Sequence, residues 1–174
     1  MHVRFTVPEL KQIDALRCEA LALPLFSDER PLRGALGLVD WRMCGFVSRL
    51  RGTGRLQGSW QETVLIPARP KLSMDKLFVF GVGASSELDP ARVRAAVDHM
   101  LDTLARARVR TTALALPGRA VGCLPPDKAM EAFIAASAQR DEHDELILLE
   151  PPDAQREMER VVERERRRAR APLP

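Results

Sequence analysis

Short apolar runs that alternate with amphipathic helical segments constrain the fold of this chain more than any other feature. Residues 19–26 are almost all apolar, which is typical of a strand that is covered on both faces. Similar or alternating runs predict further strands at 3–7, 63–66, 77–80, 112–116 and 146–149. Apolar spacings of three and four predict helices at 36–50, 90–107, 126–139 and 153–170, with Asp89 and Asp153 as helix caps.

This order of elements predicts an α/β fold in which a mostly parallel sheet lies between two layers of helices. We expect strands 3–7 and 19–26 to be neighbours, and strands 63–66 and 77–80 both to be buried. Ligands of such sheets bind beyond the carboxyl ends of the strands. The chain has 174 residues, which is enough for one domain with a substantial core.

Composition narrows the classes of function. Aromatic residues make up 5% of the chain and tyrosine is absent, so an aromatic platform for stacking nucleic-acid bases is not expected. The formal net charge is +3, but seven arginines and four glutamates between Arg156 and Arg170 account for all of it. The rest of the chain is neutral and provides no positive field of the size that binds nucleic acid.

The cysteines and the first residues indicate the compartment. Cys18, Cys44 and Cys123 are widely spaced and form no CxxC pair, which disfavours disulfides and structural zinc; we predict small core or pocket residues. The start of the chain lacks the pattern of a secretory signal, and no run approaches membrane-spanning length. We therefore expect a cytoplasmic protein that does not enter a membrane.

Glycine loops after predicted strands are the first places to look for a ligand, because backbone N–H groups there can meet an anion. Two loops hold the candidate ligand-binding residues, which are Arg33, Gly34, Gly37, Gly118, Arg119 and Gly122. The alternative for both loops is that their glycines serve only a turn and close helix packing. A third loop, 81–86, resembles a dinucleotide fingerprint, but a serine replaces its last glycine.

No complete catalytic constellation is present. His2, His99 and His143 do not share metal-ligand spacing, and neither HExxH nor GxSxG occurs, so we predict surface or helix histidines. The acidic run 141–145 lacks the spacing and glycine of a calcium loop and is interpreted as a solvated turn. We expect no catalytic residues, no bound metal and no cofactor, and a function in binding rather than in catalysis.

The last predicted helix carries a basic stripe made of arginines about one turn apart, namely Arg156, Arg160, Arg164, Arg167 and Arg168. Met158, Val161 and Val162 can dock only the first part of this helix on the body. The stripe is either a solvated charged face or a binding site for nucleic acid or an acidic protein. The change in composition predicts a domain over 1–150 and a charged helix and tail over 151–174.

Two segments carry a resemblance to a known family. Residues 23–42 form a strand, an acidic loop and a glycine-rich helix start, and together with 76–83 they resemble the amino-terminal domain of the leucine aminopeptidase (cytosol aminopeptidase) family. The resemblance covers residues 1 to about 150 and implies a macro-domain-like three-layer sandwich with about six strands. The family's two-metal site and catalytic lysine and arginine belong to a separate domain with an Asn-Thr-Asp-Ala-Glu-Gly-Arg signature. This sequence contains no such segment, so aminopeptidase activity is not expected of it.

The macro-domain comparison implies ADP-ribose as a ligand. When residues 16–23 are laid on the macro pattern Leu-x-Val-Asp-Ala-Ile-Val-Asn, the aspartate that contacts adenine falls at Gln12. The asparagine near the distal ribose falls at Leu23, so both polar groups are lost. The two glycine loops fall where a macro domain holds the diphosphate, although the second is one residue longer between its glycines.

Three functions follow as expectations. The first is a stand-alone, non-catalytic domain that acts in protein assembly or regulation, as a homo-oligomer or with another protein. The second is an ADP-ribose or nucleotide-binding module built on the two glycine loops. The third is binding of nucleic acid or an acidic partner through the arginine stripe. Hydrolysis of an ADP-ribosyl bond is a weaker fourth, because the macro asparagine is missing.

Overall fold

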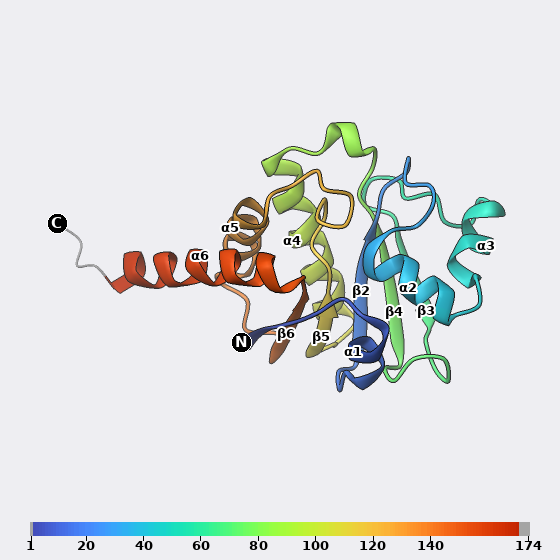
Figure 1. The fold of residues 1–174 in the computed structure, drawn as a ribbon, viewed down its shortest axis with the longest axis horizontal. Helices are drawn as coiled ribbons and strands as arrows, with labels where there is room; N and C mark the ends of the chain where they lie inside the picture. The colour runs from blue at the N-terminus through green and yellow to red at the C-terminus, as the bar shows by residue number, and fades with distance from the viewer. Residues whose placement is uncertain (1, 171–174) are drawn as a thin grey trace.

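The fold is built on a six-stranded mixed sheet (Figure 1). The computed structural model describes residues 2–170. The strands are β1 (His2–Thr6), β2 (Ala20–Leu25), β3 (Thr63–Pro67), β4 (Lys76–Gly81), β5 (Thr111–Leu114) and β6 (Glu145–Leu149). Their order across the sheet is β1-β6-β5-β2-β4-β3, and every pair is parallel except β3 with β4. The predicted mostly parallel sheet is confirmed.

Helices cover both faces of this sheet. They are α1 (Leu10–Ala15), α2 (Gly34–Arg42), α3 (Phe46–Gly52), α4 (Pro90–Arg106), α5 (Pro126–Ser137) and α6 (Pro152–Arg170), with a short 3-10 turn η1 at Ser85–Glu87. On one face α1, α2 and α3 pack on β2 through its larger side chains, which include Leu21 and Leu23. On the other face α4, α5 and α6 pack over the smaller Ala20 and Ala22. The three-layer α/β/α sandwich is thus confirmed.

Helix α4 shows how local sequence fixes an element. The side chain of Asp89 accepts a hydrogen bond of 2.7 Å from the backbone N–H of Arg92, and Pro90 begins the helix without a donor to satisfy. Val93, Val97 and the other predicted inward residues are buried. The predicted helix over 90–107 is therefore confirmed to within one residue.

The single helix predicted over 36–50 is wrong. The chain forms α2 and α3 instead, and the break falls at Cys44 and Gly45, whose φ angles are 57° and 73°. Helix α3 then starts at Phe46 with Gly45 as its N-cap, and Asp40 accepts from the backbone N–H of Ser48 at 3.1 Å and from its hydroxyl at 2.5 Å. Apolar spacing continued through the break because both helices face the same core.

Three other predictions on the sheet and helices need correction. Strands β1 and β2 are not neighbours, since β6 and β5 lie between them in the sheet. The segment that connects β1 to β2 along the chain contains the short helix α1, which the sequence pattern did not predict. Strand β3 is not buried, because it forms the edge of the sheet and Leu65 is 53% exposed. Asp153 is in the first turn of α6 and not at its cap, because the helix already begins at Pro152.

One cysteine and one histidine are placed differently from expectation. Cys123 is exposed, whereas Cys44 is exposed but lines a surface hollow, and Cys18 is partly covered, where burial raises the pKa of its thiol. His143 is buried, and its Nδ1 lies 3.2 Å from the carbonyl of Val109. Within residues 2–170 no three His, Cys, Asp or Glu side chains are grouped as a metal site would require.

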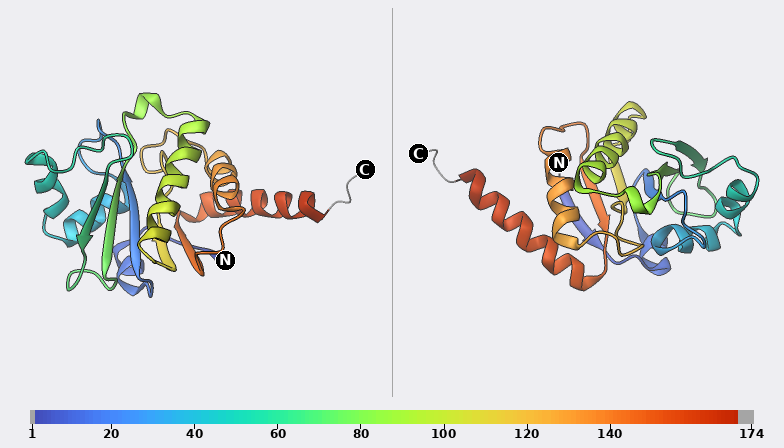
Figure 2. Two further views of the ribbon diagram at one scale, coloured as in Figure 1. Left: turned by 180° about the vertical axis from the view of Figure 1, so that it is seen from behind. Right: turned by 90° about the horizontal axis from the view of Figure 1, so that it is seen from above.

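Helix α6 extends from the body (Figures 1 and 2). Its first half packs on α5 and on the sheet through Ala154, Met158 and Val161, which are buried. The second half runs outward beyond the other helices. The first half of α6 thus shares the core of the sheet. The predicted boundary between a domain over 1–150 and a charged helix and tail over 151–174 stays a prediction. Among the described helices, none is both long enough and apolar enough to span a bilayer.

Candidate functional site

Several loops converge at the carboxyl ends of the parallel strands, where ligands of such sheets bind. Backbone hydrogen bonds tie these loops together: Ser27 donates to the carbonyl of Gly83 at 2.9 Å, and Gly83 donates to that of Gly58 at 2.9 Å. A Cβ added to Gly58 would lie 2.8 Å from the carbonyl carbon of Phe26. The loops after β2 and β4, and the loop that leads into β3, therefore form one packed edge.

The two glycine loops predicted to bind phosphate touch each other. A Cβ on Gly34 would lie only 2.6 Å from the Cβ of Ala120, which belongs to the second loop. The cavity left between them has a volume of about 20 Å³. This space suits about one water molecule, whereas pockets for small ligands usually measure about 300 to 1,000 Å³. The glycine cavity, as we call this space, is closed in this structure.

A carboxylate already occupies the anion-binding end of the glycine cavity. Glu29 lines the cavity, and its Oε1 accepts a 2.7 Å hydrogen bond from the backbone N–H of Arg33 at the start of α2. Its Oε2 accepts a longer bond of 3.4 Å from the N–H of Phe26. Burial raises the pKa of Glu29, while these hydrogen bonds oppose the shift. The N–H of Arg33, a backbone donor of the first predicted phosphate loop, is thus already satisfied by a side chain of the protein.

Arg119, predicted as a ligand-binding residue, points into the protein. Its guanidinium bonds to both carboxylate oxygens of Glu150 at 3.0 to 3.1 Å and donates to the carbonyl of Leu124 at 2.7 Å. Glu150 is 1% exposed and follows β6. This bidentate ion pair ties the second glycine loop to the end of the sheet, so Arg119 stabilises the closed loop.

The remaining candidates divide between the glycine cavity and its surroundings. Arg33 and Gly118 line the cavity, and the macro-type asparagine position is occupied by the buried apolar side chain of Leu23. Gly37 is in close contact with the carbonyl of Leu32, where a Cβ would lie 2.7 Å away. Gly122 has φ 74° and open space around it. Gln12, at the adenine-contact position, is exposed on α1.

Sequence reasoning missed an arginine pair at the same edge of the sheet. Arg30 and Arg51 line two hollows of about 280 and 310 Å³, which share these two side chains. Arg51 donates to the carbonyls of Phe26 and Ser27, each at 3.2 Å. Burial, followed by the charge of Arg30, lowers the pKa of Arg51. Isolated arginines in a loop and a helix carry no sequence signal that would bring them together.

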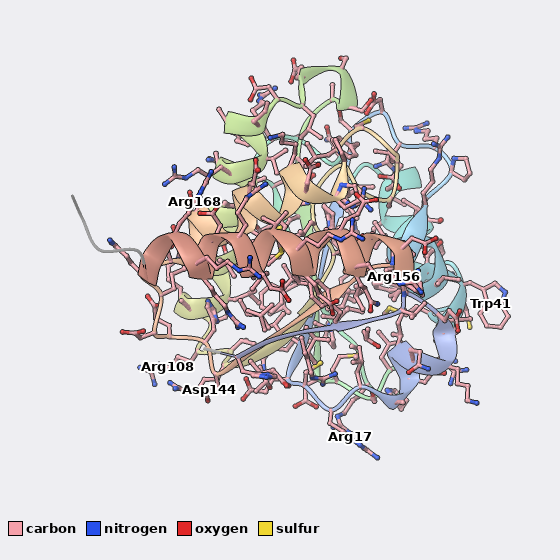
Figure 3. The ribbon with its side chains drawn as sticks, turned by 60° about the vertical axis from the view of Figure 1, so that its left-hand side comes forward. Arg17, Trp41, Arg108, Asp144, Arg156 and Arg168 are labelled. Atoms are coloured by element: carbon pink, nitrogen blue, oxygen red, sulfur yellow. The ribbon has the colours of Figure 1, made fainter. Side chains whose placement is uncertain are left out.

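The basic stripe on α6 is largely paired with acidic side chains. Arg164 bonds to Glu131 at 2.7 Å, Arg168 bonds to Glu165 at 2.9 Å, and Arg156 lies 3.4 Å from Asp153. Arg160 and Arg167 make no ion pair within residues 2–170. Figure 3 shows Arg156 and Arg168 at opposite ends of the helix, so the stripe is long and diluted by carboxylates.

A third feature lies on the opposite layer, at the break between α2 and α3. Trp41 is 70% exposed and points away from the body (Figure 3). It borders a wide hollow of about 820 Å³ together with Arg42, Cys44, Pro70 and Lys71. The ammonium of Lys71 lies 3.7 Å from the thiol of Cys44. Trp41 thus leaves a large aromatic side chain in water beside the cations Arg42 and Lys71.

Comparison with known proteins places this arrangement in a family. The model of the cytosol aminopeptidase family, N-terminal domain, matches residues 22–145. The chain belongs to this family. A search among curated proteins found no match. The resemblance to the amino-terminal domain of the aminopeptidase family, predicted from the sequence, is confirmed.

Solved structures agree on the fold. A mutant of tomato leucine aminopeptidase matches with a TM-score of 0.62 and 13% identity, over 93% of this chain and 35% of the tomato chain. A Trypanosoma brucei macrodomain in complex with ADP-ribose matches with a TM-score of 0.71 and 15% identity, over 92% and 69% of the two chains. The macrodomain of Thermus aquaticus DarG gives 0.62 and 18% identity, over 86% and 98%. The chain thus spans about a third of the tomato enzyme's length.

Proposed function

We propose that this aminopeptidase-type N-terminal domain is a non-catalytic assembly module that associates with a second copy of itself through the surface around Trp41. The observation that carries the proposal is the 70% exposure of Trp41. Tryptophan and arginine are the side chains that most often supply the binding energy of protein interfaces, and Arg42 lies next to Trp41 along α2.

The hollow beside Trp41 supports the same proposal. Its floor is made of backbone at Gly37 and Gly45, so a side chain from another molecule can approach closely. Arg42 and Lys71 provide polar groups at the rim, which is the usual arrangement around an apolar anchor. The acidic side chains there already have partners within the chain, since Asp40 is buried and accepts from the hydroxyl of Ser48, and Asp14 forms an ion pair of 3.1 Å with Arg42.

Light scattering after size-exclusion chromatography tests the assembly. We expect the natural chain to show a mass above the monomer that rises with concentration, and Trp41→Ala to return it to the monomer. Leu65→Ala is the matched control, because Leu65 is also exposed but lies on the edge strand β3. A natural chain that stays monomeric at millimolar concentration, or a Trp41→Ala variant with unchanged mass, would contradict the proposal.

The non-catalytic part of the proposal has its own assay. With added manganese or zinc, the purified chain should release no amino acid from aminoacyl amides above a metal-free control. Metal-dependent release by this chain would show that it carries peptidase chemistry by itself.

Binding of ADP-ribose is the second candidate, and the fold favours it, because the similar Trypanosoma brucei macrodomain was solved in complex with ADP-ribose. Against it stand the volume of the glycine cavity, about 20 Å³, and the carboxylate of Glu29 inside it. Binding in the cavity would require the second glycine loop to move away from α2. Calorimetry with ADP-ribose decides this candidate, since absence of heat at millimolar ligand removes it.

The arginine stripe on α6 supports a third candidate, which is binding of nucleic acid or an acidic protein. Deletion of residues 163–174, which keeps the buried Met158 and Val161, should then abolish a salt-sensitive interaction, because phosphate contacts release counterions. Unchanged binding after the deletion would count against the stripe. The ion pairs to Glu131 and Glu165 reduce the charge that the stripe can offer.

A further inference from the structure

We propose that Arg30 and Arg51 form an anion-binding site for a small phosphate-bearing ligand, at the carboxyl edge of the sheet and outside the glycine cavity. The two side chains separate two hollows of about 280 and 310 Å³ and line both of them. We call this place the arginine site. Neither Arg30 nor Arg51 lines the hollow beside Trp41, so the site does not rest on the proposed assembly.

The first argument is that neither guanidinium forms a direct ion pair in the described part of the chain, although the carboxylates of Asp28, Glu29 and Glu62 act on Arg51 from a longer distance. Among residues 2–170, no carboxylate lies within ion-pair distance of either guanidinium; the ion pairs of the chain are found elsewhere. Arg51 is only partly exposed and yet lies close enough to Arg30 for the neighbouring charge to lower its pKa. Two like charges this close repel each other, and a bound anion would relieve the part of the repulsion that the three carboxylates leave.

The second argument is that the carboxylates of this edge are already occupied. Asp28 accepts from the backbone N–H of Ser85 at 3.0 Å and from its hydroxyl at 2.6 Å. Glu29 accepts from the N–H of Arg33. Glu62 accepts from three successive N–H groups, of which that of Gly58 is nearest at 2.6 Å. Each carboxylate therefore holds a loop in place, which leaves the arginines free to meet a ligand.

The third argument is the chemistry of the lining. Ser27, Gln57 and Ser59, which carry hydroxyl and amide groups, line one hollow, and Ser48, whose hydroxyl donates to Asp40, lines the other. Two guanidinium forks surrounded by neutral donors match an oxyanion with several acceptor oxygens, which a phosphate offers and a single carboxylate does not. Arg51 uses two of its nitrogens on the carbonyls of Phe26 and Ser27 and so is held in a fixed position.

Titration calorimetry with inorganic pyrophosphate tests the arginine site. We expect measurable binding by the natural chain and a loss of about tenfold in affinity for Arg30→Ala, since one charge-assisted contact is removed. Arg17→Ala is the matched control: Arg17 is also an exposed arginine without a hydrogen bond or ion pair in the described part of the chain, and it lies at the amino edge of the sheet (Figure 3). Both variants carry the same net charge.

The outcomes separate specific binding from general attraction. Weaker binding by Arg30→Ala with unchanged binding by Arg17→Ala supports the site, and partial retention by Arg30→Lys supports it further. Equal loss in both variants, or no heat with the natural chain, overturns it. ADP-ribose as a second titrant identifies the source of the phosphate: binding that Arg30→Ala weakens assigns a nucleotide, whereas binding that Arg30→Ala leaves unchanged overturns the proposal.

Discussion

The glycine cavity and the arginine site lie at the same edge of the sheet, and Glu29 borders both. The first has the glycines and the helix start that predict phosphate binding, but it has a volume of about 20 Å³ and contains a carboxylate. The second has no recognisable motif, but it is open and presents two arginines that form no direct ion pair within residues 2–170. A glycine loop can thus serve close packing as readily as ligand binding.

The two regions differ in how their charged side chains are used. In the glycine cavity the N–H of Arg33 is satisfied by Glu29, and the second loop is held by the pair of Arg119 with Glu150. In the arginine site the carboxylates serve the backbone and the cations remain unpaired. Internal ion pairing therefore closes one region and leaves the other able to bind.

The largest expected effect concerns the ion pair that closes the glycine cavity. Arg119→Met leaves the carboxylate of Glu150 buried without a partner, and we expect the free energy of unfolding to fall by about 3 to 5 kcal/mol. Urea denaturation measures it. The double variant Arg119→Met with Glu150→Leu should recover much of the loss, since it removes both charges. A single variant as stable as the natural chain would show that the pair does not hold the loop.

Gly34 and Gly122 allow a crowded position and an open position of the two glycine loops to be compared. Both have positive φ, of 54° and 74°, but an added Cβ collides with Ala120 only at Gly34. We expect Gly34→Ala to lose about 2 to 4 kcal/mol and Gly122→Ala about 1 to 2 kcal/mol of unfolding free energy. Thermal or urea unfolding compares them. Equal losses would mean that the loops do not touch in solution.

Much of the fold was predictable, because strand and helix periodicity is local. The run 19–26 and the cap at Asp89 correspond to β2 and α4 within about a residue. The break at Cys44 was not, because the apolar spacing continues through it, and the position of β1 beside β6 was not, because it depends on pairing between distant segments. The candidate site was harder still to predict from the sequence, because contacts such as the ion pair of Arg119 with Glu150 join residues 31 positions apart.

A smaller effect concerns the titration of Glu29, which links the two regions. Burial raises its pKa above the ordinary 4.5. Such a carboxyl stabilises the folded state below its unfolded pKa, and this contribution is lost as the pH rises through the folded pKa. Glu29→Gln cannot ionise, so its stability relative to the natural chain should improve from about pH 4 to about pH 7. Urea midpoints at both pH values measure this, and a constant difference would indicate that Glu29 titrates normally.

The central claim is that an anion binds at the arginine site and not in the glycine cavity. Mapping amide chemical shifts of the labelled chain during a pyrophosphate titration tests it most directly. We predict that the shifts concentrate at Ser27, Arg30, Arg51 and Gln57, which line the hollows. Shifts confined to residues 33–37 and 118–122 would contradict the claim and return the ligand to the glycine cavity.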